Sequence, residues 1–155
     1  MRRRKAPKRE VKGDPKYNSP VVGQLINIVM QNGKKTKSQG IVYKALDIVG
    51  ERIKEDSYKV FFAAMENARP RLEVRPRRIG GATYQVPMEV PQDRGISIAL
   101  RWIRDYARGK KGKAMENKLA DEIISAYKNE GSVIKKREET HKMADANKAF
   151  AHFKW

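Results

Sequence analysis

The chain has 155 residues, a length that suits one domain with a single core. Its 35 Lys and Arg against 18 Asp and Glu give a net charge of +17, which favours a polyanionic partner, most commonly nucleic acid and less commonly an acidic membrane surface. The absence of cysteine excludes disulfides, thiolate zinc sites and cysteine nucleophiles, and the absence of a run of ~20 apolar residues excludes a transmembrane helix.

Residues 1–18 form a basic segment that contains Pro7, Gly13 and Pro15 and almost no apolar side chains. This composition predicts a flexible N-terminal arm, and we expect the folded domain to span residues 19–155. A charged start with no apolar stretch behind it is neither a secretory signal nor a membrane anchor, so we expect a soluble, cytoplasmic protein.

Three helices are predicted before residue 70. The first, over residues 19–33, begins with a serine and a proline and ends at an Asn-Gly pair. The second spans about residues 36–54, and the third spans about residues 56–69, where Pro70 ends it. The positions that we assign to the core are Val22, Leu25, Ile26, Val29, Ile41, Val42, Ala45, Leu46, Val49, Ile53, Phe61, Phe62, Met65 and Ala68.

From about residue 71 to residue 90 the apolar residues recur at every second position, which is typical of strands. Gly80-Gly81 suits a tight hairpin turn. Pro76 and Pro87 restrict both strands to sheet edges, so we predict a two-stranded hairpin that projects as an arm. The apolar contacts expected at its base are Leu72, Val74, Val86 and Met88.

Three further helices are predicted towards the C-terminus. One begins at Asp93, and a basic loop over residues 109–113 separates it from a helix that ends at Gly131. The last is capped by Ser132 and is poorly amphipathic, which indicates a surface helix. The predicted fold class is therefore mainly α: a single domain of about six helices with one projecting two-stranded β-hairpin arm.

No constellation of residues points to catalysis. His141 and His152 have no third ligand type near either of them, and adjacent carboxylates on a helix diverge. Gly33-Lys34 and Gly112-Lys113 lack the earlier glycine that a phosphate-binding loop requires. We therefore predict no enzyme activity, no catalytic residue, no metal site and no cofactor.

Basic residues are clustered, and this clustering predicts an RNA-binding surface. Arginines of the hairpin that alternate along one strand are held ~6.6 Å apart on one side of the ribbon, comparable with the phosphate repeat of a nucleic-acid strand. The planar guanidinium also suits phosphate contacts and stacking on bases. The residues that we expect to bind RNA on this basis are Lys5, Lys8, Arg9, Arg69, Arg71, Arg94, Lys110, Lys111, Lys113 and Lys148.

An aromatic tail, Phe150, Phe153 and Trp155, lies beside basic residues at the C-terminus. These rings can pack the tail on the body or stack on unpaired bases, and the sequence leaves both readings open. The isolated two-stranded arm is marginal in water, so we expect a partner to order its tip.

Two long segments resemble the bacterial small-subunit ribosomal protein seven family. They are PRLEVRPRRIGGATYQVPMEV, residues 70–90, and KKREETHKMADANKAFAHFKW, residues 135–155. Residues 32–35 and residues 99–102 also resemble this family, and the resemblance extends over nearly the whole chain.

The resemblance implies a helical body with one β-ribbon arm that binds the 3′ major domain of small-subunit rRNA and organises the head of the subunit. It implies that the arm lies near the exit-site tRNA and the mRNA path, and that small-subunit ribosomal proteins nine and eleven are neighbours. The residues that it matches to basic, RNA-binding positions of the family are Arg2, Arg3, Arg4, Lys34, Lys35, Arg75, Arg77, Arg78, Lys135, Lys136 and Arg137, several of which lie in the basic clusters described above.

Two other classes of function compete with this interpretation. A basic β-arm on a helical body also describes architectural DNA-binding proteins, but those arms carry an intercalating proline at the tip, where this chain has Gly80-Gly81. An RNA-modifying enzyme is disfavoured because no catalytic constellation is present.

Overall fold

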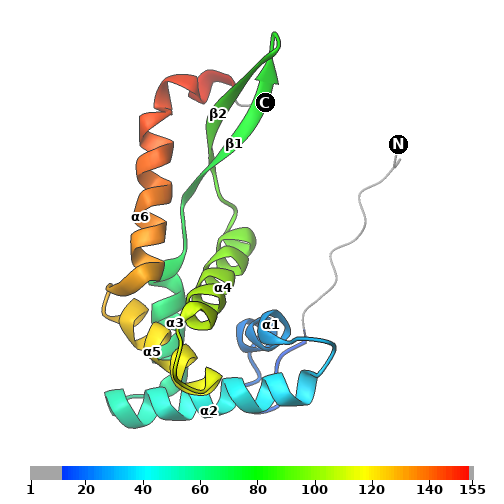
Figure 1. Cartoon of the computed structure of the whole chain (residues 1–155), viewed down its shortest axis with the longest axis vertical. Coiled ribbons are helices and arrows are strands. Elements are labelled where there is room, and N and C mark those ends of the chain that lie inside the picture. The colour runs from blue at the N-terminus through cyan, green and yellow to red at the C-terminus, as the bar shows by residue number, and fades with distance from the viewer. Residues whose placement is uncertain (1–11, 154–155) are drawn as a thin grey trace.

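The computed structural model describes residues 12–153, which form a helical body with a two-stranded antiparallel hairpin projecting from it (Figure 1). This architecture confirms the predicted fold class. The elements in chain order are α1 (Pro20–Val29), α2 (Lys35–Ile53), α3 (Ser57–Ala68), β1 (Leu72–Ile79), β2 (Ala82–Glu89), α4 (Gln92–Gly109), α5 (Met115–Tyr127), α6 (Gly131–Ala146) and the 3₁₀ helix η1 (Lys148–Phe153).

The ends of α1 and α3 follow local sequence signals. Pro20 occupies the first turn of α1, where its missing N–H costs nothing. The carboxylate of Asp56 accepts a hydrogen bond from the Tyr58 N–H and caps α3. Arg69 is extended because Pro70 follows it, and α3 ends one residue earlier, as predicted.

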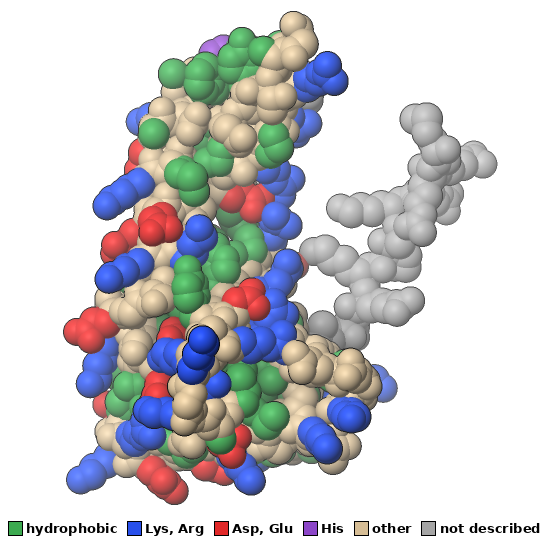
Figure 2. All heavy atoms as spheres, viewed as in Figure 1, with side chains coloured by type: hydrophobic (Ala, Val, Ile, Leu, Met, Phe, Trp, Pro, Cys, Tyr) green, Lys and Arg blue, Asp and Glu red, His purple; other side chains and the backbone are tan. Residues whose placement is uncertain are grey.

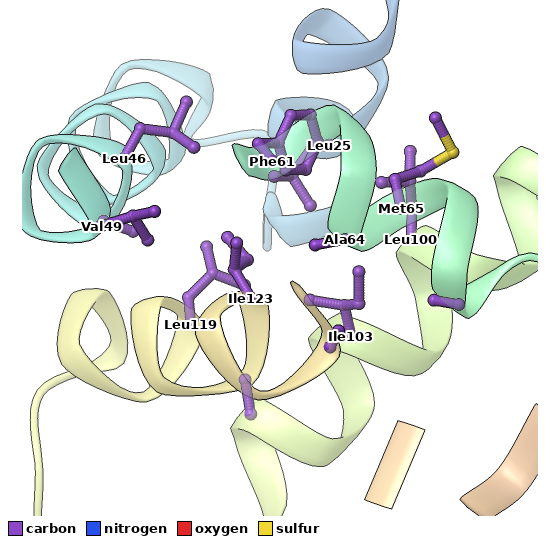
Figure 3. Close-up of a cluster of buried hydrophobic side chains, with 14 of the residues drawn as sticks. Leu25, Leu46, Val49, Phe61, Ala64, Met65, Leu100, Ile103, Leu119 and Ile123 are labelled. Atoms are coloured by element: carbon purple, nitrogen blue, oxygen red, sulfur yellow. The ribbon is translucent and has the colours of Figure 1, made fainter. Parts of the chain in front are cut away.

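The core is formed by apolar side chains of the first five helices and the first turn of α6. Phe61 of α3 and Leu25 of α1 belong to the same buried cluster, and both are fully buried (Figure 3). Leu119 and Ile123 of α5 point into the same cluster, which explains why α5 packs against both α2 and α3. Phe62, which the sequence assigned to the core, is 42% exposed, because adjacent residues of a helix point about 100° apart and Phe61 takes the inward direction.

The hairpin closes at Gly80 and Gly81, whose φ angles of 56° and 90° are the left-handed values that a tight hairpin turn requires. The register pairs Arg75 with Val86, so these two side chains lie on one face of the ribbon. The described residues hold this single two-stranded sheet, which confirms the interpretation of the strand prolines.

Burial along β1 differs from the expected pattern. Leu72 and Val74 are half-buried, whereas Glu73 between them is buried with Val86 of β2. The alternation of apolar residues along β1 therefore does not predict which position is buried here. The physical reason is an ion pair with Arg94 of α4, which the spacing of apolar residues cannot show.

The packed body begins before residue 19. Asp14 is only 4% exposed, and its carboxylate accepts hydrogen bonds from the N–H groups of Lys16, Tyr17 and Ser19 and from the Tyr43 hydroxyl. Burial alone would raise the pKa of Asp14, but these donors outweigh it and hold the pKa below its ordinary value. Asp14 and Tyr17 of the segment predicted as an arm therefore pack on the body, and residues 1–11 lie outside the described part.

The C-terminal elements support the hairpin along its length. Helix α6 begins at Gly131, whose φ is 89°, and not after a Ser132 cap as predicted. In η1, which follows α6, the ring centroids of Phe150 and Phe153 lie 5.3 and 5.4 Å from that of Tyr84 in β2. These two aromatic residues therefore pack on the arm, while Trp155 lies outside the described residues.

Candidate nucleic-acid interface

The hairpin and α4 carry arginine and no lysine. Between Lys59 and Lys110 the sequence holds nine arginines without a single lysine. Six of the nine were predicted RNA contacts, and the structure adds Arg101, Arg104 and Arg108 of α4. Their helical spacing and the switch from lysine to arginine are the sequence signals that could have identified them.

Arginines of α4 lie along one side of the helix. Arg94, Arg101 and Arg108 are seven residues apart, about two turns, so they share a face that runs from the hairpin base to α1. In Figure 2, where Lys and Arg share the blue colour, blue side chains follow one another along the edge of the molecule formed by the hairpin and α4. We call this surface the arginine ridge; its members are Arg75, Arg77, Arg94, Arg101, Arg104 and Arg108.

The lower end of the arginine ridge closes the C-terminus of α1. Arg104 donates from Nη1 to the Ile28 carbonyl at 3.4 Å, and Arg108 donates from Nη2 to the Val29 carbonyl at 3.0 Å. These carbonyls belong to the last turn of α1 and have no partner within the helix. The two arginines are thus held in place by the fold.

The upper end of the arginine ridge is organised by Glu73. Its Oε1 accepts from Nε of Arg75 at 2.6 Å and from Nε of Arg94 at 3.0 Å, and its Oε2 accepts from Nε of Arg94 at 2.9 Å. The Glu73 side chain is 11% exposed, whereas those of Arg75 and Arg94 are 43% and 47% exposed. One covered carboxylate therefore joins two half-exposed guanidinium groups from different elements.

The arginines of β1 do not all lie on one face. Arg75 and Arg77 are two residues apart and share a face of the ribbon, as the alternation predicts. Arg78, paired with Thr83, lies on the opposite face and is exposed. The expected row of arginines therefore holds for two of the three strand positions.

Arg69, Arg71 and Arg137 meet in a cleft of about 510 Å³ between α3, the start of β1 and α6. The cleft has mixed charge, because Arg69 pairs with Glu66 at 2.8 Å and Arg137 lies 3.7 Å from Glu138. Arg137 also donates to the Asn67 carbonyl. Part of the positive charge in this cleft therefore serves to hold α3 and α6 together.

His141 lines the same cleft and joins α6 to the hairpin. Its Nε2 accepts a hydrogen bond of 3.0 Å from the Arg71 N–H. Burial, together with the charges of Arg137 and Arg71, lowers the pKa of His141 against a smaller opposing effect of Asp145. The neutral ring is thereby favoured, and only a ring nitrogen without a proton can accept this bond.

The remaining predicted contacts are of three kinds: paired with a carboxylate, exposed, or outside the described residues. Lys110 pairs with the buried Glu122 at 2.7 Å, and Lys113 pairs with Asp121 at 3.2 Å, so both hold the loop between α4 and α5 on the body. Lys136 is half-buried and lies 3.6 Å from Glu139. Exposed positions are held by Lys34, Lys35, Lys111, Lys135 and Lys148. The predicted contacts that lie outside the described residues are Arg2, Arg3, Arg4, Lys5, Lys8 and Arg9.

Residues 12–153 contain no group of three or more His, Asp or Glu side chains placed to hold a metal ion. Within the same residues, no helix combines the length and the apolar character needed to cross a membrane.

Comparison with known proteins covers the whole chain. A family model described as ribosomal protein S7p/S5e matches residues 1–148. Small ribosomal subunit protein uS7 of Thermodesulfovibrio yellowstonii is 59% identical over 154 residues, 99% of either chain. The protein of the same name from Thermotoga maritima is 58% identical over 155 residues, 100% of each chain. That from Acidithiobacillus ferrooxidans is 53% identical over 154 residues, 99% of each chain.

Proposed function

Because the chain belongs to the ribosomal protein S7p/S5e family, and is thus a structural, non-enzymatic constituent of the small ribosomal subunit, we propose that it binds the 3′ major domain of small-subunit rRNA and organises the head of the subunit. Family membership confirms the resemblance predicted from the hairpin and C-terminal segments. It also confirms the predicted lack of enzyme activity and the cytoplasmic location within the ribosome.

The arginine ridge is the observation that carries the proposed rRNA contact. Arg104 and Arg108 are bonded to carbonyl groups of α1, and Arg75 and Arg94 are bonded to Glu73, so four guanidinium groups have a fixed direction. Fixed donors recognise a folded RNA backbone at a lower entropic cost than flexible ones. The N-terminal basic residues and Lys34-Lys35 are proposed as additional phosphate contacts.

The hairpin tip supports a second part of the proposal, that the arm reaches the exit-site tRNA and the mRNA. Residues 78–83 include no buried side chain, and the hairpin extends away from the body (Figure 1). A tip that contributes nothing to the core is free to contact other molecules. Small-subunit ribosomal proteins nine and eleven are proposed as neighbours, and the segment before the packed Asp14 as an arm ordered by RNA.

The test is binding of the purified full-length chain to a transcript of the 3′ major domain, with a transcript of another rRNA domain as control. If six to ten phosphates are neutralised, the affinity should fall about a thousandfold or more between about 50 and about 200 mM salt. Chemical protection mapping on the same complex identifies the contacted nucleotides. Equal affinity for both transcripts, or a flat salt response, would overturn the proposal.

A further inference from the structure

Glu73 is an unexpected residue at an RNA-binding surface. A carboxylate beside a phosphate backbone repels it, and covering a carboxylate from water costs free energy unless charged partners offset that cost. Glu73 is nonetheless 11% exposed and lies between the two guanidinium groups at the upper end of the arginine ridge. The two arginines offset the cost of covering one carboxylate, and the pairing also fixes the positions of the two guanidinium groups.

The joint that Glu73 bridges is tightly packed. Helix α4 starts against the residues that lead into β1, and a Cβ added at Gly95 would lie 2.8 Å from Cγ of Arg69 and 3.3 Å from the Pro70 carbonyl oxygen. The backbone of Arg94 is therefore fixed relative to β1. Because packing already fixes α4 relative to β1, the ion pair between Glu73 and Arg94 mainly restricts the conformations of the side chains involved.

The geometry of the pair leaves phosphate-binding donors available. Arg75 and Arg94 both contact Glu73 through Nε, and these contacts do not use the Nη groups of either guanidinium. Both Nε atoms lie within 3.0 Å of the same Glu73 oxygen, so the two guanidinium groups are neighbours. Without the carboxylate, two like charges at this separation repel and the long side chains regain their rotamers.

We propose that Glu73 is a positioning residue of the rRNA interface, which fixes Arg75 and Arg94 side by side so that their Nη groups bind the RNA phosphate backbone together. This inference rests on the proposed function, because it assumes that the arginine ridge binds rRNA. It assigns to an acidic residue a favourable contribution to binding a polyanion.

The test uses Glu73→Gln in the full-length chain, with Glu89→Gln as the matched control. Glu89 is exposed on β2 of the same hairpin, and both changes remove one negative charge. Charge alone predicts that both variants bind the rRNA transcript more tightly than the parent chain. Positioning predicts that Glu73→Gln binds about fivefold more weakly, because ordering each long side chain costs roughly a factor of two to ten in affinity.

Two further measurements separate positioning from a loss of folding. Glu73→Gln should also reduce the salt dependence of binding, because fewer phosphates are neutralised, whereas partial unfolding lowers the affinity by the same factor at every salt concentration. In a chain that already carries Arg75→Gln and Arg94→Gln, adding Glu73→Gln should no longer weaken binding. Circular dichroism and thermal unfolding establish that each variant is folded.

The possible outcomes distinguish the proposed role of Glu73 from the proposed function of the protein. Tighter binding by Glu73→Gln, an unchanged salt dependence, or the same loss in the double-arginine background would each overturn the role of Glu73 while leaving rRNA binding intact. Failure of the parent chain to prefer the 3′ major domain transcript would instead overturn the proposed function.

Discussion

Replacing Asp14 by asparagine should destabilise the protein strongly, although residue 14 lies in a segment whose composition suggests flexibility. Oδ2 of Asp14 accepts from the N–H groups of Lys16 and Tyr17 and from the Tyr43 hydroxyl, and Oδ1 accepts from the Ser19 N–H. An asparagine amide can accept at one of these two positions. The best orientation keeps its oxygen at the Oδ2 position and turns its NH₂ towards the Ser19 N–H.

The magnitude follows from this geometry. The buried Ser19 N–H loses its partner and faces another donor, which costs about 1–3 kcal/mol. The three remaining bonds lose the negative charge of their acceptor, and charge-assisted hydrogen bonds are about twice as strong as neutral ones. We therefore expect a loss of about 2–4 kcal/mol in the free energy of unfolding, and at about 2–4 °C per kcal/mol a fall in Tm of about 5–15 °C.

Urea unfolding and thermal unfolding of the full-length chain measure this loss, and Asp47→Asn is the matched control. Asp47 pairs with Lys16 of the same segment, but these two side chains are 52% and 43% exposed, so the control should cost no more than about 1 kcal/mol. If Asp14→Asn is as mild as Asp47→Asn, residues 14–19 contribute little to the folded body and the reasoning fails.

Two further changes test the hairpin and its support. Replacing residues 78–83 by Asn-Gly closes the strands at the pair Arg77 and Tyr84 and should change Tm little, because no buried side chain is removed. The shortened hairpin should weaken rRNA binding modestly and impair reading-frame maintenance more. A collapsed fold or unchanged reading-frame accuracy would contradict this. Burial and, after it, the charge of Arg137 lower the pKa of His141, so at acidic pH the folded state binds fewer protons than the unfolded state. The contribution of His141 to stability is therefore present above about pH 6.5 and is lost as the pH falls below that value. Urea midpoints between about pH 7.5 and about pH 5.5 should therefore fall in the parent chain and fall less in His141→Ala.

The elements that the sequence predicted best are those defined by local chemistry. Pro20 and Pro70 restrict the backbone around them, and Gly80-Gly81 permits the positive φ angles of a tight turn. The start of α1, the end of α3 and the hairpin turn could therefore be found without knowledge of the fold. Helical spacing likewise identified the core stripe of α1, which is buried as expected. Phe62 was misassigned because apolar character was counted without asking which direction each side chain takes.

The features that the sequence missed depend on partners far away along the chain. Glu73 is buried because Arg94 of α4 reaches it, and Asp14 is buried in part because Tyr43 of α2 donates to it. Arg108 is held by a carbonyl of α1. A polar residue read alone predicts exposure, and only the packing of separate elements shows that its charge or hydrogen-bonding capacity is satisfied in the interior.

The net charge of the chain favours a polyanionic partner, but it does not explain the arrangement of the proposed interface. If charge alone mattered, lysine would serve on the hairpin and on α4 as it does on the rest of the described body, yet this segment carries arginine throughout. A guanidinium can donate one N–H inward, as Arg94 does to Glu73 and Arg108 does to Val29, and still present other N–H groups outward. An ammonium group concentrates its donors at one point at the end of a flexible stem and has no such fixed division. Arginine therefore allows the same side chains to be held by Glu73 or by carbonyl groups of α1 and to present directed donors for the proposed contact with rRNA.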